Sequence, residues 1–215
     1  VGLSSLNASF ESILGHSSPV DARVFGVTPQ TDTARLTKQV KAVDGVKDVT
    51  YVPSLDLTQT VNGQTEETTV DVIDIDAIDP IVRTTSGLED LDDGTLIVGG
   101  IYRIPDGSKV TLTGTAGSVE LTARVREGWG AVVSPAVAQR LNGDAPTNTT
   151  MWVRSTGSTM TPATERALNT AVRGQELMVS GSASGVERMS SQIMRVALIV
   201  CLVVGAALVI ALSGL

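Results

Sequence analysis

The longest hydrophobic run of the chain is at its C-terminal end. From Val196 to Leu215, twenty consecutive residues carry no charge, whereas hydrophobic positions elsewhere come in short runs separated by polar residues. A helix of twenty residues is about 30 Å long, which matches the hydrocarbon layer of a bilayer. The pattern therefore predicts a transmembrane helix, and a buried core helix is the alternative.

Polar residues ahead of this run predict that the helix begins earlier. Ser184 and Glu187 have the S-x-x-E spacing of a capping box, which starts a helix at about Gly185. No helix-breaking residue separates this start from Arg195, where the apolar run begins. We expect one helix over residues 183–215, whose first third forms a stalk outside the lipid.

Small residues recur within the predicted span. Ala197, Cys201 and Gly205 are spaced four residues apart, and such rows let a second helix approach closely. The alternative is the ordinary use of small apolar side chains on a helix that faces lipid.

Both ends of the chain suggest that it is part of a larger protein. Leu3, Leu6, Phe10 and Leu14 have helical spacing and predict a second stalk helix over residues 1–19. The chain begins without a methionine and ends inside the apolar run. We therefore expect a fragment of a longer membrane protein with another span before Val1, and a C-terminal tail anchor is the competing interpretation.

Two segments of the remaining chain share a strand-helix-strand pattern. The strand-like runs are 21–27, 46–52, 150–154 and 177–179, and the helices between them open at Thr28 or Asp32 and at Thr161. In the second helix, the spacing predicts that Ala163, Ala167 and Leu168 face the core. The two units, 20–54 and 146–182, predict a split ferredoxin-like, or porter-like, α/β sandwich.

The segment between the two units is rich in strand patterns. Asn62-Gly63 separates strand-like runs over 55–61 and 64–75, which is a strong hairpin signal. Alternating residues predict a second hairpin over 109–126, and Ser134 caps a short helix. We predict a small β-rich subdomain over 55–145. With the sandwich it makes an α+β extracytoplasmic domain over 20–182.

Composition narrows the class of function. The 215 residues are 42% hydrophobic, 18% charged and 3% aromatic, with a formal net charge of −7. A negatively charged chain repels phosphate backbones, and few aromatic rings are present for stacking on bases. The composition argues against a nucleic-acid partner. The single cysteine, Cys201, excludes an internal disulfide.

The residues that enzymes use are mostly missing. His16 is the only histidine and lies in the predicted N-terminal stalk, which disfavours a Ser-His-Asp base and a histidine metal cluster. The stretch from Gly181 to Gly185 has alanine at its centre, so it is not a nucleophile elbow. We predict no enzyme, no catalytic or metal site and no cofactor.

Two weaker signals have both a structural and a functional interpretation. Acidic residues gather around 71–79 and 89–93, where they either hold Ca²⁺ or protect a solvated strand edge. Trp129 lies between two glycines and is either a contact for a partner or a plug in the β-rich core.

The arrangement resembles the extracytoplasmic domain of the MacB/FtsX-type ABC-transporter permeases. By organisation the resemblance covers essentially the whole chain. It is clearest in TDTARLTKQVKAVDGVKDVTYV (31–52), in GAVVSPAVAQRL (130–141) and in the segment 183–215, which is similar to the start of that family's second membrane span. The family places a porter-like α/β part with a β-rich insertion between its first and second spans.

The resemblance implies a permease subunit in the cell membrane, with its large domain on the extracytoplasmic side. It implies mechanotransmission, in which a cytoplasmic ABC ATPase drives the membrane helices and the stalks move the outer domain. The partners are then that ATPase, a second permease half or a second copy of the chain, membrane lipid, and a client outside the cytoplasm. Family members export peptides, macrolides or lipoproteins, or activate cell-wall hydrolases.

Two other classes remain open from the sequence. A binding module tethered to the membrane by a passive anchor would have the same hydrophobic run, and further spans beyond Leu215 would distinguish the two. A membrane-anchored hydrolase is disfavoured by the missing histidine.

Overall fold

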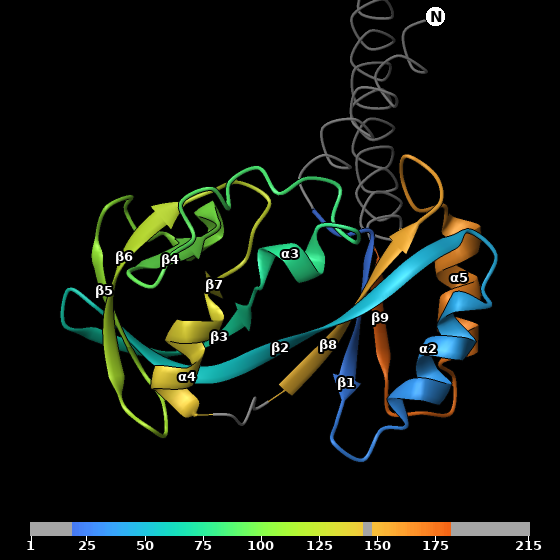
Figure 1. Ribbon diagram of the computed structural model, residues 1–215, viewed down its shortest axis with the longest axis horizontal. Helices are drawn as coiled ribbons and strands as arrows, with labels where there is room; N and C mark the ends of the chain where they lie inside the picture. The colour runs from blue at the N-terminus through green and yellow to red at the C-terminus, as the bar shows by residue number, and fades with distance from the viewer. Residues whose placement is uncertain (1–18, 144–147, 182–215) are drawn as a thin grey trace, which may run out of the picture.

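One continuous network of strands organises the chain (Figure 1). The computed structural model describes residues 19–143 and 148–181. The strand order is β3-β7-β4-β6-β5-β2-β8-β1-β9, and β3 also pairs with β2. Because β2 pairs with both β3 and β5, the ring β2-β3-β7-β4-β6-β5 closes into a barrel. The strands β8, β1 and β9 extend from it as an open sheet.

The open sheet has a ferredoxin-like order. Its elements are β1 (Ala22–Val27), α2 (Thr33–Lys41), the first half of β2 (Val46–Val61), β8 (Asn148–Ser155), α5 (Pro162–Ala171) and β9 (Met178–Gly181). The order β2-β8-β1-β9 is antiparallel throughout, as in a split β-α-β pair. The predicted mixed α/β fold is confirmed.

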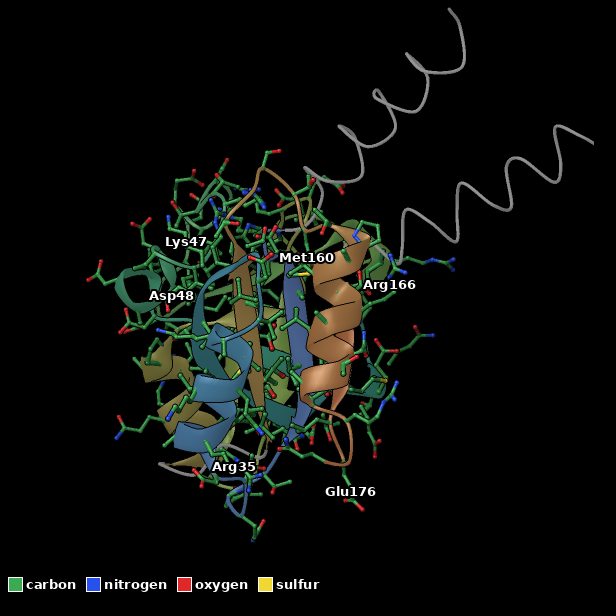
Figure 2. The ribbon with its side chains drawn as sticks, turned by 90° about the vertical axis from the view of Figure 1, so that its right-hand side faces the viewer. Arg35, Lys47, Asp48, Met160, Arg166 and Glu176 are labelled. Carbon is green, nitrogen blue, oxygen red and sulfur yellow. The ribbon has the colours of Figure 1, made fainter. Side chains whose placement is uncertain are left out.

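Both helices cover the same face of the open sheet, as Figure 2 shows. Helix α2 starts where Asp32 accepts a hydrogen bond from the Arg35 backbone N–H over 2.9 Å, so Asp32 rather than Thr28 opens it. Leu36 and Val40 lie one turn apart and are buried against the sheet. Successive strand residues face opposite sides, so Met151 faces this layer from β8.

The other helix differs from its predicted orientation. Thr164, Glu165 and Leu168 are buried on α5, whereas Ala163 and Ala167 are exposed, so the prediction that both alanines face the core is wrong. Two glycines explain the difference, because a Cβ on Gly45 would lie 2.5 Å from Thr164 and one on Gly181 would lie 2.5 Å from Glu165. Without Cβ atoms there, two polar side chains pack close to the backbone.

A single strand joins the sheet to the barrel. Two separate runs were expected on either side of Pro53, but β2 is continuous over sixteen residues. Up to Ser54 it pairs with β8, and from Ser54 onward it pairs with β3. Pro53 lacks a backbone N–H and is tolerated where ladder bonding is incomplete. Here it lies at the position where β2 changes partners.

The barrel has its own hydrophobic core. Its other elements are β3 (Gln64–Val72), α3 (Ile75–Ile78), β4 (Thr95–Val98), η1 (Gly100–Tyr102), β5 (Lys109–Thr113), β6 (Ser118–Val125), β7 (Val132–Val133) and α4 (Pro135–Asn142). Leu112 and Leu121 are fully buried inside it, and Leu141 joins them from α4. Strand β4 is buried at all four positions, so it has no alternating pattern in the sequence. The predicted strand to Ile75 ends earlier, because Asp74 caps α3.

The tight turn between β2 and β3 gives a testable prediction. Asn62 and Gly63 have φ values of 51° and 79°, the left-handed pair that a type I′ turn requires. Because valine is strained at positive φ, we expect Asn62→Val to lower the free energy of unfolding by about 1–3 kcal/mol. The control is Gln64→Val, at the exposed next strand position, which should stay within about 0.5 kcal/mol. Urea unfolding of the purified chain compares them, and equal effects would contradict the turn assignment.

Several predictions lie outside the described residues. They include the N-terminal stalk up to residue 18, the capping box of Ser184 and Glu187, and the apolar helix with its row of small residues. Within 19–143 and 148–181, no helix combines the length and the hydrophobicity needed to cross a bilayer.

Candidate functional site

The two ends of the described chain are neighbours in the sheet. Ala22 begins β1 and is paired directly with Gly181, the last residue of β9. The chain therefore enters and leaves the domain side by side, on adjacent antiparallel strands. Any displacement of one end relative to the other acts on the β1–β9 ladder.

A buried ion pair fixes the first of these ends. Asp21, directly before β1, is 3% exposed. The Arg83 Nε–H donates to its Oδ1 over 2.6 Å, while the backbone N–H and the hydroxyl of Ser155 donate to its Oδ2 over 2.8 and 2.9 Å. We call Asp21, Arg83 and Ser155 the Asp21 cluster. Both carboxylate oxygens are satisfied, as a buried charge requires.

Arg83 has further bonds that tie three segments together. Its Nη2 donates to the Ser155 hydroxyl over 3.1 Å and to the Gly157 carbonyl over 3.0 Å. Its backbone N–H donates to the Pro19 carbonyl over 2.9 Å. The start of the chain is thus held both to the end of β8 and to the segment between α3 and β4. Both carboxylate oxygens of Asp21 and the Nε and Nη2 atoms of Arg83 are bonded to protein, so the cluster ties these segments together.

A second charged contact crosses between the sheet and the barrel. Arg23 on β1 forms an ion pair with Asp71 on β3, with 3.3 Å between Nη1 and Oδ2. Its guanidinium lies 4.8 Å from the ring centroid of Trp152 on β8, within the range of a cation–π contact. Burial raises the pKa of the Asp71 carboxyl, and the positive charge of Arg23 partly opposes that rise.

This contact lies in a crevice of about 450 Å³ between the two parts. The crevice is lined by Phe25 and Thr28 from the sheet side and by Asp71 and Tyr102 from the barrel side, together with Arg23 and Asn148. In the described part of the chain, no three metal-ligating side chains come together. Polar and apolar side chains therefore both line the crevice.

The raised pKa of Asp71 gives a pH prediction with a definite sign. Between the ordinary pKa of 3.8 and the higher pKa of the folded state, the unfolded carboxyl is mostly ionised while the folded one is mostly protonated. The folded state then binds more protons, so the contribution of Asp71 to stability falls as pH rises through this window. We expect the stability of Asp71→Asn relative to the unmodified chain to increase as pH rises from about 4.

Urea unfolding at a series of pH values measures this difference. Asp48 is a matched control, because the hydrogen bond from Lys41 lowers the pKa of its carboxyl. Asp48→Asn should therefore lose stability relative to the unmodified chain as pH rises. A parallel pH dependence in the two variants would contradict the prediction.

The structure places Trp129 in the interior. Its side chain is 4% exposed, its Nε1–H donates to the Ser86 carbonyl over 2.8 Å, and its ring centroid lies 6.5 Å from that of Trp152. It packs between the barrel and the open sheet rather than inside the barrel. In this conformation Trp129 has the packing role. The remaining predicted site residues, Ser184 to Gly205, lie outside the described residues.

The acidic segments also have structural partners. Asp71 faces Arg23, Asp92 accepts hydrogen bonds from Gly94 and Thr95, and Asp93 accepts one from Ser134. The Asp21 cluster, in contrast, was not expected from the sequence. Its only local sign is a carboxylate directly before a strand.

Comparison with known proteins finds neither a matching family model nor a matching curated relative. Among solved structures, the chain is similar to the periplasmic region of MacB from Actinobacillus actinomycetemcomitans, with 9% identity and a TM-score of 0.38, covering 86% of this chain and 96% of that one. It is also similar to the extracellular domain of the noncanonic ABC-type transporter YknZ from Gram-positive bacteria, with 16% identity and a TM-score of 0.35, covering 75% and 100%. Neither is described as an FtsX protein, so that part of the resemblance stays a prediction.

Proposed function

We propose that the chain is the extracytoplasmic domain of an ABC-transporter permease and that it transmits movement from membrane helices to a client. One observation carries the proposal. Ala22 and Gly181 are paired neighbours, and only fourteen residues of sequence separate Gly181 from an uncharged run long enough to span a bilayer. A domain with adjacent ends is suited to sit on two membrane-directed segments.

The contacts at these ends connect them to both the open sheet and the barrel. The Asp21 cluster joins the first end to β8 and to the α3–β4 segment, and β2 continues from the sheet into the barrel. A shift of one end is then passed to both parts of the domain. To be driven by an ATPase, such a shift needs partners that bind the two positions differently.

The proposal includes definite partners. A cytoplasmic ABC ATPase would supply the energy, and a second permease half or a second copy of this chain would complete the membrane part. Lipid surrounds the span, and the client binds outside the cytoplasm. The proposal assigns no catalytic chemistry to the domain.

The alternative function is that of a binding module held to the membrane by a passive anchor. The crevice around Arg23 and Asp71 favours it. A tethered binding module would use the crevice and would need no stiff connection to the membrane. The two functions therefore differ in how they depend on the segment between Ser184 and Arg195.

Interrupting that segment distinguishes them. A proline inside a helix removes a hydrogen bond and costs about 3 kcal/mol or more, so Gln192→Pro would interrupt the helix that the sequence predicts here. We expect this variant, in the complete transporter reconstituted in vesicles, to retain ATP hydrolysis while losing most of the coupled output. Gln192→Ala is the control, because alanine favours the predicted helix. Full output from Gln192→Pro would favour the passive anchor and contradict transmission through the stalk.

A further inference from the structure

The crevice between the open sheet and the barrel is built beside a bulge in β1. Between Val24 and Val27 the register of β1 against β8 shifts, so β1 has one extra residue there. Bulges of this kind redirect side chains and are common beside functional sites. Gly26 lies in the bulge with φ +90°, and a Cβ on it would collide with the Glu176 carbonyl oxygen. Because Phe25 and Gly26 both line the crevice, the bulge forms part of its wall.

Two opposite charges line the crevice and keep polar atoms free. Arg23 and Asp71 make one contact, with 3.3 Å between Nη1 and Oδ2, whereas charge-assisted hydrogen bonds from N–H groups are usually about 2.7–2.9 Å long. Within residues 19–143 and 148–181, neither side chain makes another hydrogen bond or ion pair. The Nε and Nη2 atoms of Arg23 and the Oδ1 atom of Asp71 have no protein partner there, and all three are accessible. Two donors and one acceptor are therefore open to a bound molecule.

Trp152 supports the guanidinium of Arg23 on one side. The Arg23 Cζ atom lies 4.8 Å from the centroid of this fully buried ring. An arginine stacked on an aromatic ring can still direct the N–H groups at its edge to a planar carboxylate. The Arg23 side chain is 25% exposed and that of Asp71 is 14% exposed. A ligand would therefore meet both charges partly shielded from water, where charged hydrogen bonds are stronger.

We propose that this crevice binds a free amino acid with an aromatic side chain. The α-carboxylate of the ligand accepts hydrogen bonds from Arg23, and its α-ammonium donates to the Oδ1 atom of Asp71. The two protein charges are direct neighbours. The matching charges of the ligand must be neighbours too, as they are on a single α-carbon.

The balance of charge favours a zwitterion over other small ligands. A phosphate or a simple carboxylate would be attracted by Arg23 but repelled by Asp71, and a simple amine would be repelled by Arg23. A zwitterion satisfies both residues. In a peptide the terminal charges are several bonds apart, so a peptide matches this close pair less well.

The other walls of the crevice favour an aromatic side chain on the ligand. Phe25 lines the crevice from the sheet side and Tyr102 lines it from the barrel side. Aromatic rings pair favourably in offset and edge-to-face arrangements. The volume of about 450 Å³ is within the range of about 300–1,000 Å³ that is typical of small-molecule sites. A bound amino acid would thus contact both the open sheet and the barrel.

Calorimetric titration of the purified full chain tests the pairing of charges. Phenylalanine carries both charges, phenylpropionate lacks the ammonium, and phenylethylamine lacks the carboxylate. We expect phenylalanine to bind about tenfold more tightly than either analogue, because a hydrogen bond to a charged group contributes roughly that factor or more. Equal affinity for the three compounds, or no binding of phenylalanine at millimolar concentration, would overturn the proposal.

Alanine tests the aromatic part of the assignment in the same titration. It has the same two charges without a ring, and we expect it to bind about fivefold more weakly than phenylalanine. Alanine that bound as tightly as phenylalanine would overturn the role given to Phe25 and Tyr102.

Two variants assign each charge of the ligand to its residue. Arg23→Gln should abolish the preference for phenylalanine over phenylethylamine, because the carboxylate has lost its partner. Asp71→Asn should abolish the preference over phenylpropionate, because the ammonium has lost its partner. Asp48→Asn removes a charge that pairs with Lys41 outside the crevice, and this control should keep both preferences.

Each preference compares two ligands on one protein, so a general loss of stability in a variant does not imitate the expected change. Preferences that persisted in both crevice variants would overturn the assignment of Arg23 and Asp71. The titrations involve neither transport nor ATP hydrolysis, so their outcome is independent of the proposed permease function.

Discussion

Replacing Arg83 with methionine is expected to lower the free energy of unfolding by about 3–5 kcal/mol, because it leaves the Asp21 carboxylate buried without its counter-ion. Asp21 is 3% exposed and the Arg83 side chain is 19% exposed, so the ion pair is largely shielded from water. Ser155 still donates two hydrogen bonds, but these do not neutralise the charge. Urea unfolding of the purified full chain measures the loss.

Two further variants distinguish the effect of the unpaired buried charge on stability from the effect of losing a side chain. Lys41→Met breaks the ion pair with Asp48, whose partners are 47% and 40% exposed, and should cost about 1 kcal/mol or less. Adding Asp21→Asn to Arg83→Met removes the unpaired charge and should recover part of the loss. If Arg83→Met lowered the free energy of unfolding no more than Lys41→Met, the Asp21 cluster would not hold the chain segments together as described above.

Local signals in the sequence identified the helix starts of the open sheet and one hairpin of the barrel. Asp32 and Thr161 cap α2 and α5 as their side chains predict, and Asn62-Gly63 turns the hairpin. Each signal depends on bonds between residues three or four positions apart, which the local sequence specifies. The mixed α/β class followed from these elements alone.

The closed barrel could not be predicted in the same way. The hairpin of β2 with β3 is local, but closure also depends on β2 pairing with β5 and on the parallel pairing of β3 with β7. The strands of these last two pairs lie far apart in the chain, and no local pattern indicates which strand edges meet. A fully buried strand such as Thr95–Val98 also lacks alternation, so its type is ambiguous from the sequence.

The Asp21 cluster could not be predicted from the sequence for the same reason. Asp21 and Arg83 are 62 positions apart, and Asp21 and Ser155 are 134 apart. An aspartate ahead of a strand and an arginine in a loop are ordinary surface residues until the fold brings them together. Trp129 was visible because tryptophan is rare in this chain, but its burial depends on Ser86 and Trp152, which lie 43 and 23 positions from it in the sequence.

Replacing Trp152 with alanine is expected to cost about 3–5 kcal/mol, the range for deleting a fully buried tryptophan. Trp152 is 0% exposed and lies on the face of β8 opposite the helices, where it packs with Val52, Ile97 and Trp129. The deletion leaves a cavity between the open sheet and the barrel and also removes the ring beneath Arg23. We therefore expect a large loss in urea unfolding of the purified chain.

Trp152→Phe tests whether the loss of stability comes from removing the aromatic ring that packs between the open sheet and the barrel. Phenylalanine keeps an aromatic face for Arg23, and it removes an indole N–H that has no hydrogen-bond partner in the described part of the chain. Removing an unsatisfied buried donor offsets some of the lost volume, so this variant should lose less than half as much stability as Trp152→Ala. If the two variants were equally destabilised, the packing of the indole itself, rather than an aromatic bridge between sheet and barrel, would set the stability of this interface.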